Sequence, residues 1–426
     1  MRLNELEKLL EETRARTLKI LNFKKDEEER GLELHKKYIV IDSMHTGEGV
    51  MPYSERMVQR AGEMVATGIP PGKIYAQMAS MRAVDTVEDP KTRKEYVEVW
   101  RKSGVTCGNR TLWIGSSGGF MEAIRYISHA RRRIDGLREV EILATCADDI
   151  KRAKKEEKRA ILWNFQNTTV LNFLSSFIDM DDEINNIDLF YGLGVRVMQL
   201  TYNLRNLVGD GCTSRYESGL SYFGVKVVAR MNKLGMLVDT GHCGYQTTLD
   251  AVEFSKVPIA ATHTTCKGVY DHRRGKTDEE MKAIAENGGY VGINLLPVFL
   301  GGKGTIKDFL DHVDYAVNLI GADHVGIGTD TMYSSHVPQS LIELRKRMRH
   351  ARGLGIGSWS GFRRGEPKAS IELSPEMKSD ETSMGSLAWI NWPYYTVGLV
   401  SRGYSDQEIK GIIGGNFLSL LEKVIG

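Results

Sequence analysis

The sequence has few of the features that mark exported, membrane-spanning or nucleic-acid-binding proteins. Its 426 residues include only five cysteines, an odd number without a CxxC pair, which argues against a disulfide scaffold and favours reduced thiols. Lys and Arg (57) nearly balance Asp and Glu (55), so the net charge of +2 gives no reason to expect a nucleic-acid or membrane partner. No apolar run approaches the roughly 20 residues that a membrane span requires.

The N-terminal segment also lacks targeting features. Residues 1–36 have no apolar core like that of a secretory signal, and they contain too many acidic residues for a transit peptide. The spacing of Leu3, Leu6, Leu9 and Leu10 instead predicts an amphipathic helix. We therefore expect a cytoplasmic protein whose chain begins with one helix.

The composition is that of an ordinary globular protein. Hydrophobic residues make up 41% of the chain and charged residues 26%, which is enough for a large core. The length suits one large α/β barrel, and no internal repeat or low-complexity linker divides the chain. We expect residues 37–426 to form a single domain.

Short apolar segments alternate with helix-like segments through this domain. Such alternation predicts parallel strands joined by helical crossovers, and near-continuous apolar strands are typical of a sheet covered on both faces. Eight strands predict an α/β fold of the (β/α)8 TIM-barrel type. The expected strands are 37–42, 104–109, 159–165, 194–200, 235–240, 257–262, 289–294 and 324–329.

Two long segments interrupt the alternation. Residues 46–100, which contain a GIPPG breaker, follow the first strand, and residues 333–385, which contain a Gly-rich stretch, follow the eighth. In a barrel both insertions would rise over the C-terminal ends of the strands, where active sites lie. We expect them to form pocket walls.

Polar residues follow three predicted strands at points where they would meet. His242 follows the fifth strand, His263 the sixth and Asp330 the eighth. Two imidazoles from neighbouring strand ends can bind one zinc ion, and a carboxylate opposite them can take the proton of an attacking water. Each residue alone also fits a structural role, as a buried imidazole or a loop cap, but together they favour metal or acid–base chemistry.

Other polar residues near these strand ends give weaker signals. Arg274 in HRRGKTDEE can hold a substrate carboxylate, but the same stretch reads as a solvated turn before a helix that Thr277 and Glu280 cap. Tyr202 and Asn203 follow the fourth strand and can line a pocket, although both residue types are common in loops. The residues alone leave these roles open.

The sequence contains, in this order from about residue 159, the stretches GVRVMQLTYN, GLSYFG, MNKLGMLVDTGH, PIAATHTTC, HRRGKTDEE, NGGYVGIN, VGIGTD and GIIGGNF. Together they resemble the renal or membrane dipeptidase family of metal-dependent amidohydrolase barrels. The resemblance implies a barrel enzyme that hydrolyses dipeptides or related amides at a binuclear zinc site, often as a homodimer. It implies His242 and His263 as ligands of one zinc, Asp330 as the group that handles the proton of water, and Arg274 as the holder of the substrate carboxylate.

The sequence departs from the family pattern at the other zinc. The family has His-x-Asp after the first strand, where an ungapped alignment of VIDSMHTGEG places Met44 and Thr46. His45 then points to the opposite side of the strand and would reach a metal only through a bulge. Gln166 stands where the family has a metal-bridging glutamate, and a neutral amide bridges two cations poorly. Tyr202 replaces a histidine that contacts the substrate.

These departures predict a hydrolase of dipeptides or related small amides that holds one zinc, or another divalent metal, rather than two. His242 and His263 would hold the metal, perhaps joined by Gln166 or Asp330. The substrate would be a small molecule that bears a carboxylate. Two alternatives remain open: a lyase- or isomerase-type acid–base enzyme on the same barrel, with or without metal, and a non-hydrolytic binding homologue.

Overall fold

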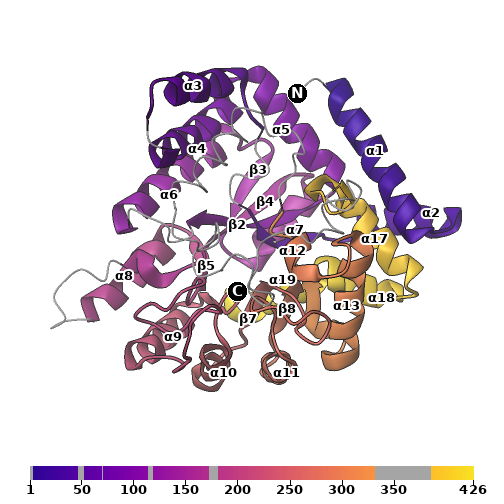
Figure 1. Cartoon of the computed structure of the whole chain (residues 1–426). Coiled ribbons are helices and arrows are strands. Elements are labelled where there is room, and N and C mark those ends of the chain that lie inside the picture. The colour runs from indigo at the N-terminus through magenta and orange to yellow at the C-terminus, as the bar shows by residue number, and fades with distance from the viewer. Residues whose placement is uncertain (1–2, 47–51, 70, 114–118, 172–180, 332–384) are drawn as a thin grey trace.

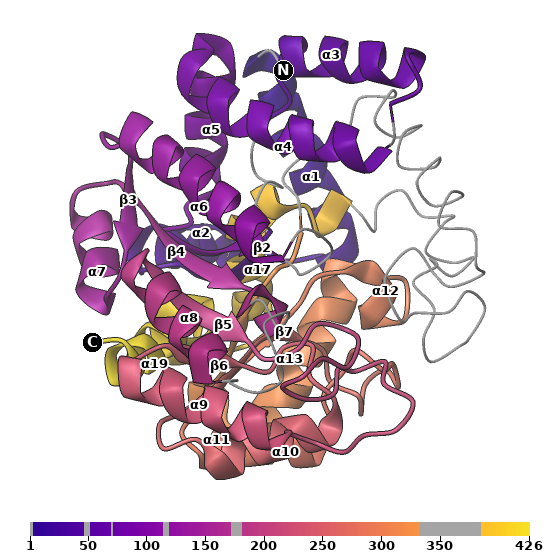
Figure 2. The same cartoon turned by 90° about the vertical axis from the view of Figure 1, so that its left-hand side faces the viewer.

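A central parallel sheet with surrounding helices forms the body of the protein (Figures 1 and 2). The architecture is that of a computed structural model. The structure describes residues 3–46, 52–69, 71–113, 119–171, 181–331 and 385–426.

Eight parallel strands follow one another around the central sheet. Their order is β1-β2-β4-β5-β6-β7-β8-β9, with each strand hydrogen-bonded to the next. This order confirms the predicted (β/α)8 barrel, and each of the eight expected strands overlaps an observed one. The strands are β1 (Ile41–His45), β2 (Cys107–Trp113), β4 (Arg159–Phe165), β5 (Val195–Gln199), β6 (Leu237–Asp239), β7 (Ala260–Thr264), β8 (Tyr290–Ile293) and β9 (Val325–Ile327).

One further strand, β3 (Glu141–Ala144), lies beside this path and pairs with β4. This strand is not among the predicted ones, because it has only four residues and begins with a charged one. Glu141 is nevertheless buried, because it accepts a hydrogen bond from the Tyr96 hydroxyl and lies 3.6 Å from the guanidinium of Arg133. A buried charge persists in a fold when it is paired in this way.

Asp42 joins the first and last strands of the barrel. Its carboxylate accepts hydrogen bonds from the backbone N–H and the hydroxyl of Thr329 (2.8 and 2.7 Å) and from the indole N–H of Trp389 (2.8 Å). The backbone N–H of Asp330 also donates to the carbonyl of Met44 (3.0 Å). These contacts fix the ends of β1 and β9 side by side, and they determine where Met44 and Asp330 lie.

Helices surround the sheet in the order expected for crossover connections (Figure 1). They are α1 (Leu3–Leu21), α2 (Lys25–Lys37), α3 (Glu55–Ala66), α4 (Pro71–Glu88), α5 (Pro90–Ser103), α6 (Gly119–Gly136), α7 (Ala147–Lys155), α8 (Asp181–Gly192), α9 (Tyr222–Leu234), α10 (Tyr245–Phe254), α11 (Asp278–Glu286), α12 (Pro297–Leu300), α13 (Ile306–Ile320), α17 (Trp392–Ser401), α18 (Asp406–Lys410) and α19 (Asn416–Val424). A π-helical turn, Gly411–Gly415, joins the last two of these helices.

The N-terminal segment forms two helices where the sequence analysis expected one. The chain turns at Asn22, which has a positive φ of 49°, between α1 and α2. A bidentate pair of 2.7 Å bonds from Arg14 to Glu28 ties the two helices together, and the Tyr394 hydroxyl from α17 also donates to Glu28 (2.9 Å). The start of the chain therefore packs against its C-terminal part.

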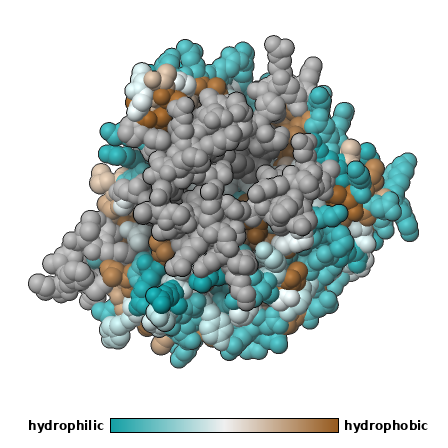
Figure 3. Space-filling view, in the orientation of Figure 1, coloured by the Kyte–Doolittle hydropathy of each residue, from teal (hydrophilic) through white to brown (hydrophobic). Residues whose placement is uncertain are grey.

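The first predicted insertion contributes α3, α4 and α5, which lie at one edge of the molecule (Figure 2). Residues 333–384 of the second lie outside the described part. None of the described helices is both long enough and apolar enough to cross a membrane. In the view of Figure 3 the described rim of the molecule is mainly hydrophilic, with scattered apolar residues.

Candidate metal and substrate site

Two histidines face each other at the C-terminal ends of neighbouring strands. His242 lies in the turn after β6, and His263 lies near the end of β7. Their Nε2 atoms are 2.9 Å apart, and both side chains are buried. The barrel therefore brings together the two imidazoles that the sequence analysis placed at adjacent strand ends.

The side-chain amide of Asn203 determines which nitrogen of His242 carries the proton. The Asn203 oxygen lies 2.6 Å from His242 Nδ1, and the thiol of Cys212 also points to this oxygen at 3.7 Å. An amide oxygen can only accept a hydrogen bond, so Nδ1 of His242 is protonated. Nε2 of His242 therefore carries a lone pair.

Thr262 and Asp239 orient His263 in the same way. The Thr262 hydroxyl donates to the Asp239 carboxylate at 2.7 Å, which leaves the hydroxyl oxygen to accept from His263 Nδ1 at 3.0 Å. The Asp239 carboxylate also accepts from the backbone N–H of Gly241 (2.9 Å). Nε2 of His263 therefore also carries a lone pair. This chain of hydrogen bonds was not predicted from the sequence, although Asp239 stands three residues before His242 in LVDTGH.

The two histidines are neutral and offer their lone pairs to one point. Burial lowers the pKa of both imidazoles well below the usual value, and the guanidinium of Arg274 lowers it further. At 2.9 Å the two Nε2 atoms are close enough to share a proton or to bind one cation together. Imidazole nitrogens whose other N–H is held by an oxygen are typical zinc ligands. These donors fit one divalent ion.

No third metal-binding side chain from the described residues groups with this pair. Within the described ranges, His, Cys, Asp and Glu side chains form no group of three or more that could hold a metal ion. The donors in this part of the chain thus amount to two nitrogens, which suits a single ion held with modest affinity.

Asp330 lies just past β9 in a conformation that is uncommon for its residue type. Its φ is 51°, in the left-handed region that aspartate tolerates better than most residues, and its backbone N–H bond to Met44 holds it there. Loss of hydration raises the pKa of its carboxyl to about 7, with Asp42 acting in the same direction and Arg274 against it. A carboxyl with this pKa can accept and release a proton near neutral pH.

Arg274 lies in the turn between β7 and α11, where it is buried. Its guanidinium donates to the backbone carbonyls of Gly241 and His263, the latter at 2.7 Å. Its Nε has no hydrogen-bond partner among the described residues. The turn is fixed from one side by the imidazole of His272, which accepts from the Arg274 backbone N–H (3.1 Å). From the other side it is fixed by the predicted capping box of Thr277 and Glu280 at the start of α11.

The ring of Tyr202 stacks against the imidazole of His242. The ring centroids of Tyr202 and His242 are 4.3 Å apart with an interplanar angle of 25°. Burial raises the pKa of the Tyr202 hydroxyl well above its usual value, and the Asp330 charge adds to this effect. The phenol therefore remains protonated and can serve only as a neutral hydrogen-bond donor or acceptor.

A hydrogen-bonded cluster of neutral groups lies at the ends of β1, β2 and β4. The amide nitrogen of Gln166 donates to the Thr111 hydroxyl (2.8 Å) and to the Met44 sulfur (3.0 Å). The Thr111 hydroxyl also donates to the amide oxygen of Asn164 (3.2 Å), whose nitrogen donates to Asn109 (2.9 Å). Both hydrogens of the Gln166 amide are thus used within the cluster, and the cluster contains no carboxylate or imidazole.

His45 lies apart from this cluster, in an aromatic pocket. Its ring stacks on Trp389 (centroids 5.5 Å apart) and meets Trp100 edge-on (5.3 Å). A Cβ on Gly108 would come within 2.8 Å of the His45 ring, so a glycine makes room for it. Neither ring nitrogen of His45 has a described partner, and burial lowers its pKa to about 3. The register of β1 against β2 shifts between Asp42 and His45, but this placement does not favour His45 as a ligand.

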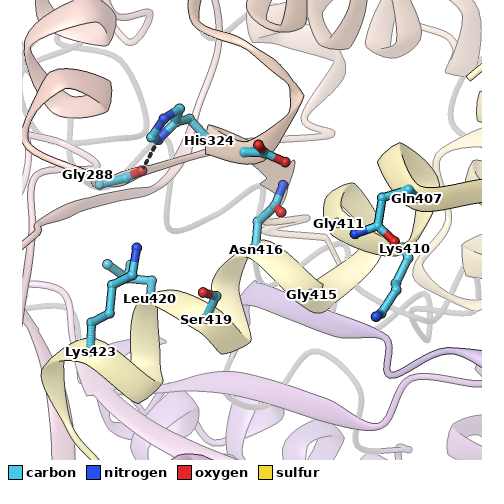
Figure 4. A pocket seen from close by; sticks show the side chains of 12 residues that line it. Gly288, His324, Gln407, Lys410, Gly411, Gly415, Asn416, Ser419, Leu420 and Lys423 are labelled. Atoms are coloured by element: carbon cyan, nitrogen blue, oxygen red, sulfur yellow. Dashed lines mark hydrogen bonds between the residues drawn. The ribbon is translucent and has the colours of Figure 1, made fainter. Parts of the chain in front are cut away.

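A cavity of about 390 Å³ lies away from this site, at the N-terminal ends of β8 and β9 (Figure 4). The imidazole of His324 there donates to the carbonyl of Gly289 (2.8 Å), and the amide of Asn416 donates to two backbone carbonyls. Lys410 and Lys423 extend in different directions (Figure 4). The polar groups of this cavity hold the backbone and do not converge, in contrast to those around His242.

Comparison with known proteins connects this geometry to a family. The sequence pattern described as "Membrane dipeptidase (Peptidase family M19)" matches residues 120–348, which is more than half of the chain. The chain belongs to the membrane dipeptidase family. The matched region contains Gln166, His242, His263, Arg274 and Asp330.

Curated relatives match parts of the chain. An uncharacterized dipeptidase of Schizosaccharomyces pombe is 34% identical over 163 residues, which cover 37% of this chain and 40% of that protein. Dipeptidase verJ of Clonostachys rogersoniana is 29% identical over 237 residues, 55% of this chain and 50% of that protein. The chain thus spans about half or less of the length of these relatives.

A solved structure covers more of the chain. An amidohydrolase from Pseudomonas aeruginosa superimposes with a TM-score of 0.67 and 27% identity over 92% of this chain and 98% of that one. The probable dipeptidase PvdM, also from Pseudomonas aeruginosa, shares the fold with a TM-score of 0.60 and 17% identity, over 94% of this chain and 99% of that one.

Proposed function

We propose that the protein is a metallohydrolase that cleaves a dipeptide or a related small amide bearing a carboxylate, with one metal ion in its site. The observation that carries the proposal is the pair of neutral imidazoles whose Nε2 lone pairs face each other at 2.9 Å. Zinc is the metal that such a donor pair favours, with another divalent ion as the alternative. When bound, the metal would supply Lewis acidity that polarises a carbonyl or a water.

The remaining side chains have distinct roles in this proposal. Arg274 binds the substrate carboxylate through the part of its guanidinium that is not engaged with backbone carbonyls. Asp330 takes the proton of the attacking water and returns it to the leaving amine, which suits a carboxyl with a pKa of about 7. Tyr202 and Asn203 line the pocket beside His242, and Tyr202 offers its hydroxyl to the substrate.

The second metal of a binuclear centre does not fit the residues that are present. Met44 and Gln166 meet in the neutral cluster, where the Gln166 amide nitrogen donates to the sulfur. Without a charged ligand at these positions, a second dication would have to be desolvated against a thioether and an amide. The proposed reaction therefore uses a single metal ion.

Metal content and hydrolysis, measured on the same preparation, test this function. We expect about one zinc per chain in protein purified without added metal, and cleavage of small amides with a free carboxylate that stops on chelation and returns with zinc. Two zinc ions per chain would contradict the single-metal site. Absence of both metal and hydrolysis after addition of zinc or manganese would favour acid–base chemistry or a binding role on the same barrel. The resemblance also suggests a homodimer, which the mass in solution would test.

Arg274→Lys tests the role of the guanidinium. Lysine keeps the positive charge but loses the planar fork that binds a carboxylate. We expect KM for a substrate with a free carboxylate to rise about 10-fold or more, while KM for the same substrate with an amidated C-terminus changes little. Steady-state kinetics with this matched pair of substrates decide the point, and an equal change for both would contradict the role.

Gln166→Glu tests the neutral cluster. Glutamate restores a carboxylate, but Met44 still fills the neighbouring position, so we expect the single variant to retain no additional metal. We expect the double variant Met44→His with Gln166→Glu to raise retained zinc from about one towards two per chain. Atomic spectroscopy of dialysed protein measures the outcome, with Met44→Leu as the control. Two metals in the single variant would show that Met44 does not block the position.

A further inference from the structure

A separate cavity of about 270 Å³ opens beside the site, between the loop that connects β5 to α9 and the loop that connects β7 to α11. His242, His263 and Arg274 do not line this cavity. It nevertheless lies close to the site, because Cys243 follows His242 and Gly275 follows Arg274 in the chain, and both line the cavity.

Two cysteines form the wall between this cavity and the site. The backbone N–H of Cys212 donates to the carbonyl of His242 (2.8 Å), and its thiol points to the Asn203 oxygen that holds the His242 ring. The Cys243 thiol lies 3.3 Å from the Thr201 hydroxyl. Burial raises the pKa of both thiols, that of Cys212 to about 11, so the wall is uncharged.

Charged side chains of both signs line the cavity. Glu217 comes from the β5–α9 loop, and its carboxylate accepts from the backbone N–H of Gln246 (3.1 Å) in the first turn of α10. Lys267 and Arg273 come from the β7–α11 loop, which also contributes Asp271. Neither Lys267 nor Arg273 forms an ion pair with a described residue. The lining thus combines an acid with two cations, and no ion pair within the described part of the chain joins them.

We propose that this cavity binds a free amino acid in its zwitterionic form. Its ammonium would pair with the Glu217 carboxylate, and its carboxylate would pair with Lys267 and Arg273. A ligand with charge of only one sign fits less well, because Glu217 repels a pure anion and the two cations repel a pure cation. The volume suits a single amino acid with a medium-sized side chain.

The proposal goes beyond the hydrolytic function, and the binding itself does not depend on that function. If the chain does hydrolyse dipeptide-like amides, the ligand is of the same class as the product. The bound amino acid would then lie one side chain away from the Asn203–His242 contact, across Cys212.

Calorimetric titration of the full-length protein with three matched ligands tests the proposal. L-leucine carries both charges, N-acetyl-L-leucine lacks the ammonium, and L-leucinamide lacks the carboxylate. We expect L-leucine to bind about two- to five-fold more tightly than either analogue, which is the change that one partly exposed ion pair supplies. We expect Glu217→Gln to remove the preference over N-acetyl-L-leucine, and Arg273→Gln to reduce the preference over L-leucinamide.

Two control variants separate this cavity from the rest of the protein. Arg274→Lys alters the site of the proposed hydrolysis, and Arg131→Gln removes an exposed cation on α6. Both variants should leave L-leucine binding unchanged. Glu217→Gln retains an oxygen for the Gln246 N–H, so its fold should be intact. Equal affinity for the three ligands, no binding of L-leucine at millimolar concentration, or loss of binding through Arg274→Lys alone would each overturn the proposal. A protein that binds L-leucine but hydrolyses no amide would refute only the proposed function.

Discussion

Replacing His263 with alanine is expected to remove nearly all of the bound metal and at least 99% of the hydrolytic activity. The reason is that the described residues offer only two nitrogen ligands, so the loss of one leaves a single imidazole. A lone buried imidazole cannot hold a zinc ion against water at neutral pH with useful affinity. The measurements are zinc per chain after dialysis and the rate of amide cleavage at saturating zinc.

Two further variants should affect metal binding less than His263→Ala does. Thr262→Val removes the hydroxyl through which Asp239 orients His263, and the loss of such an outer contact lowers metal affinity about 10- to 100-fold. Added zinc should therefore rescue Thr262→Val but not His263→Ala. His324→Ala at the opposite end of the strands should change neither metal content nor rate. If His263→Ala kept its metal, the two-histidine site proposed here would be wrong.

Much of the barrel could be predicted because each strand has a strong local signal. The stretch RAILWNF is apolar over its whole length, and the observed β4 has the predicted bounds, Arg159–Phe165. The other seven strands of the barrel differ from their predicted limits by a few residues at one end or both. β3 was missed because it is short and begins with Glu141, a charge that is buried through contacts with Arg133, in the preceding helix, and with Tyr96, 45 residues earlier.

The candidate site could be predicted less completely than the barrel. The position of His242 and His263 after neighbouring strands was enough to predict that they meet, because parallel strands end at the same edge. The roles of Asn203, Thr262 and Asp239 as orienting groups depend on side-chain directions over distances below 3.1 Å, which spacing cannot give. The neutral cluster of Met44, Thr111 and Gln166 likewise depends on three strands that are separate in the chain.

Asp42→Ala is expected to destabilise the fold by about 3–5 kcal/mol, because it leaves several buried donors without a partner. The Asp42 carboxylate accepts from the backbone and the hydroxyl of Thr329 and from the indole of Trp389, all within 2.8 Å, and from the backbone of Met44 at 3.3 Å. Each unsatisfied buried donor costs about 1–3 kcal/mol, and partial rearrangement lowers the sum. The free energy of unfolding from urea titration measures the effect.

The same variant also tests how the barrel closes. Asp42 fixes the end of β9 beside β1, and that contact places Asp330, whose backbone N–H bonds to Met44. Asp42→Asn keeps one acceptor oxygen and should lose about half as much stability as Asp42→Ala, while Asp135→Asn on the exposed face of α6 should lose less than about 0.5 kcal/mol. Because Asp330 moves with the end of β9, residual folded Asp42→Asn protein should show a reduced kcat with its zinc content unchanged. A stable Asp42→Ala variant with normal kcat would mean that backbone packing alone closes the barrel and positions Asp330.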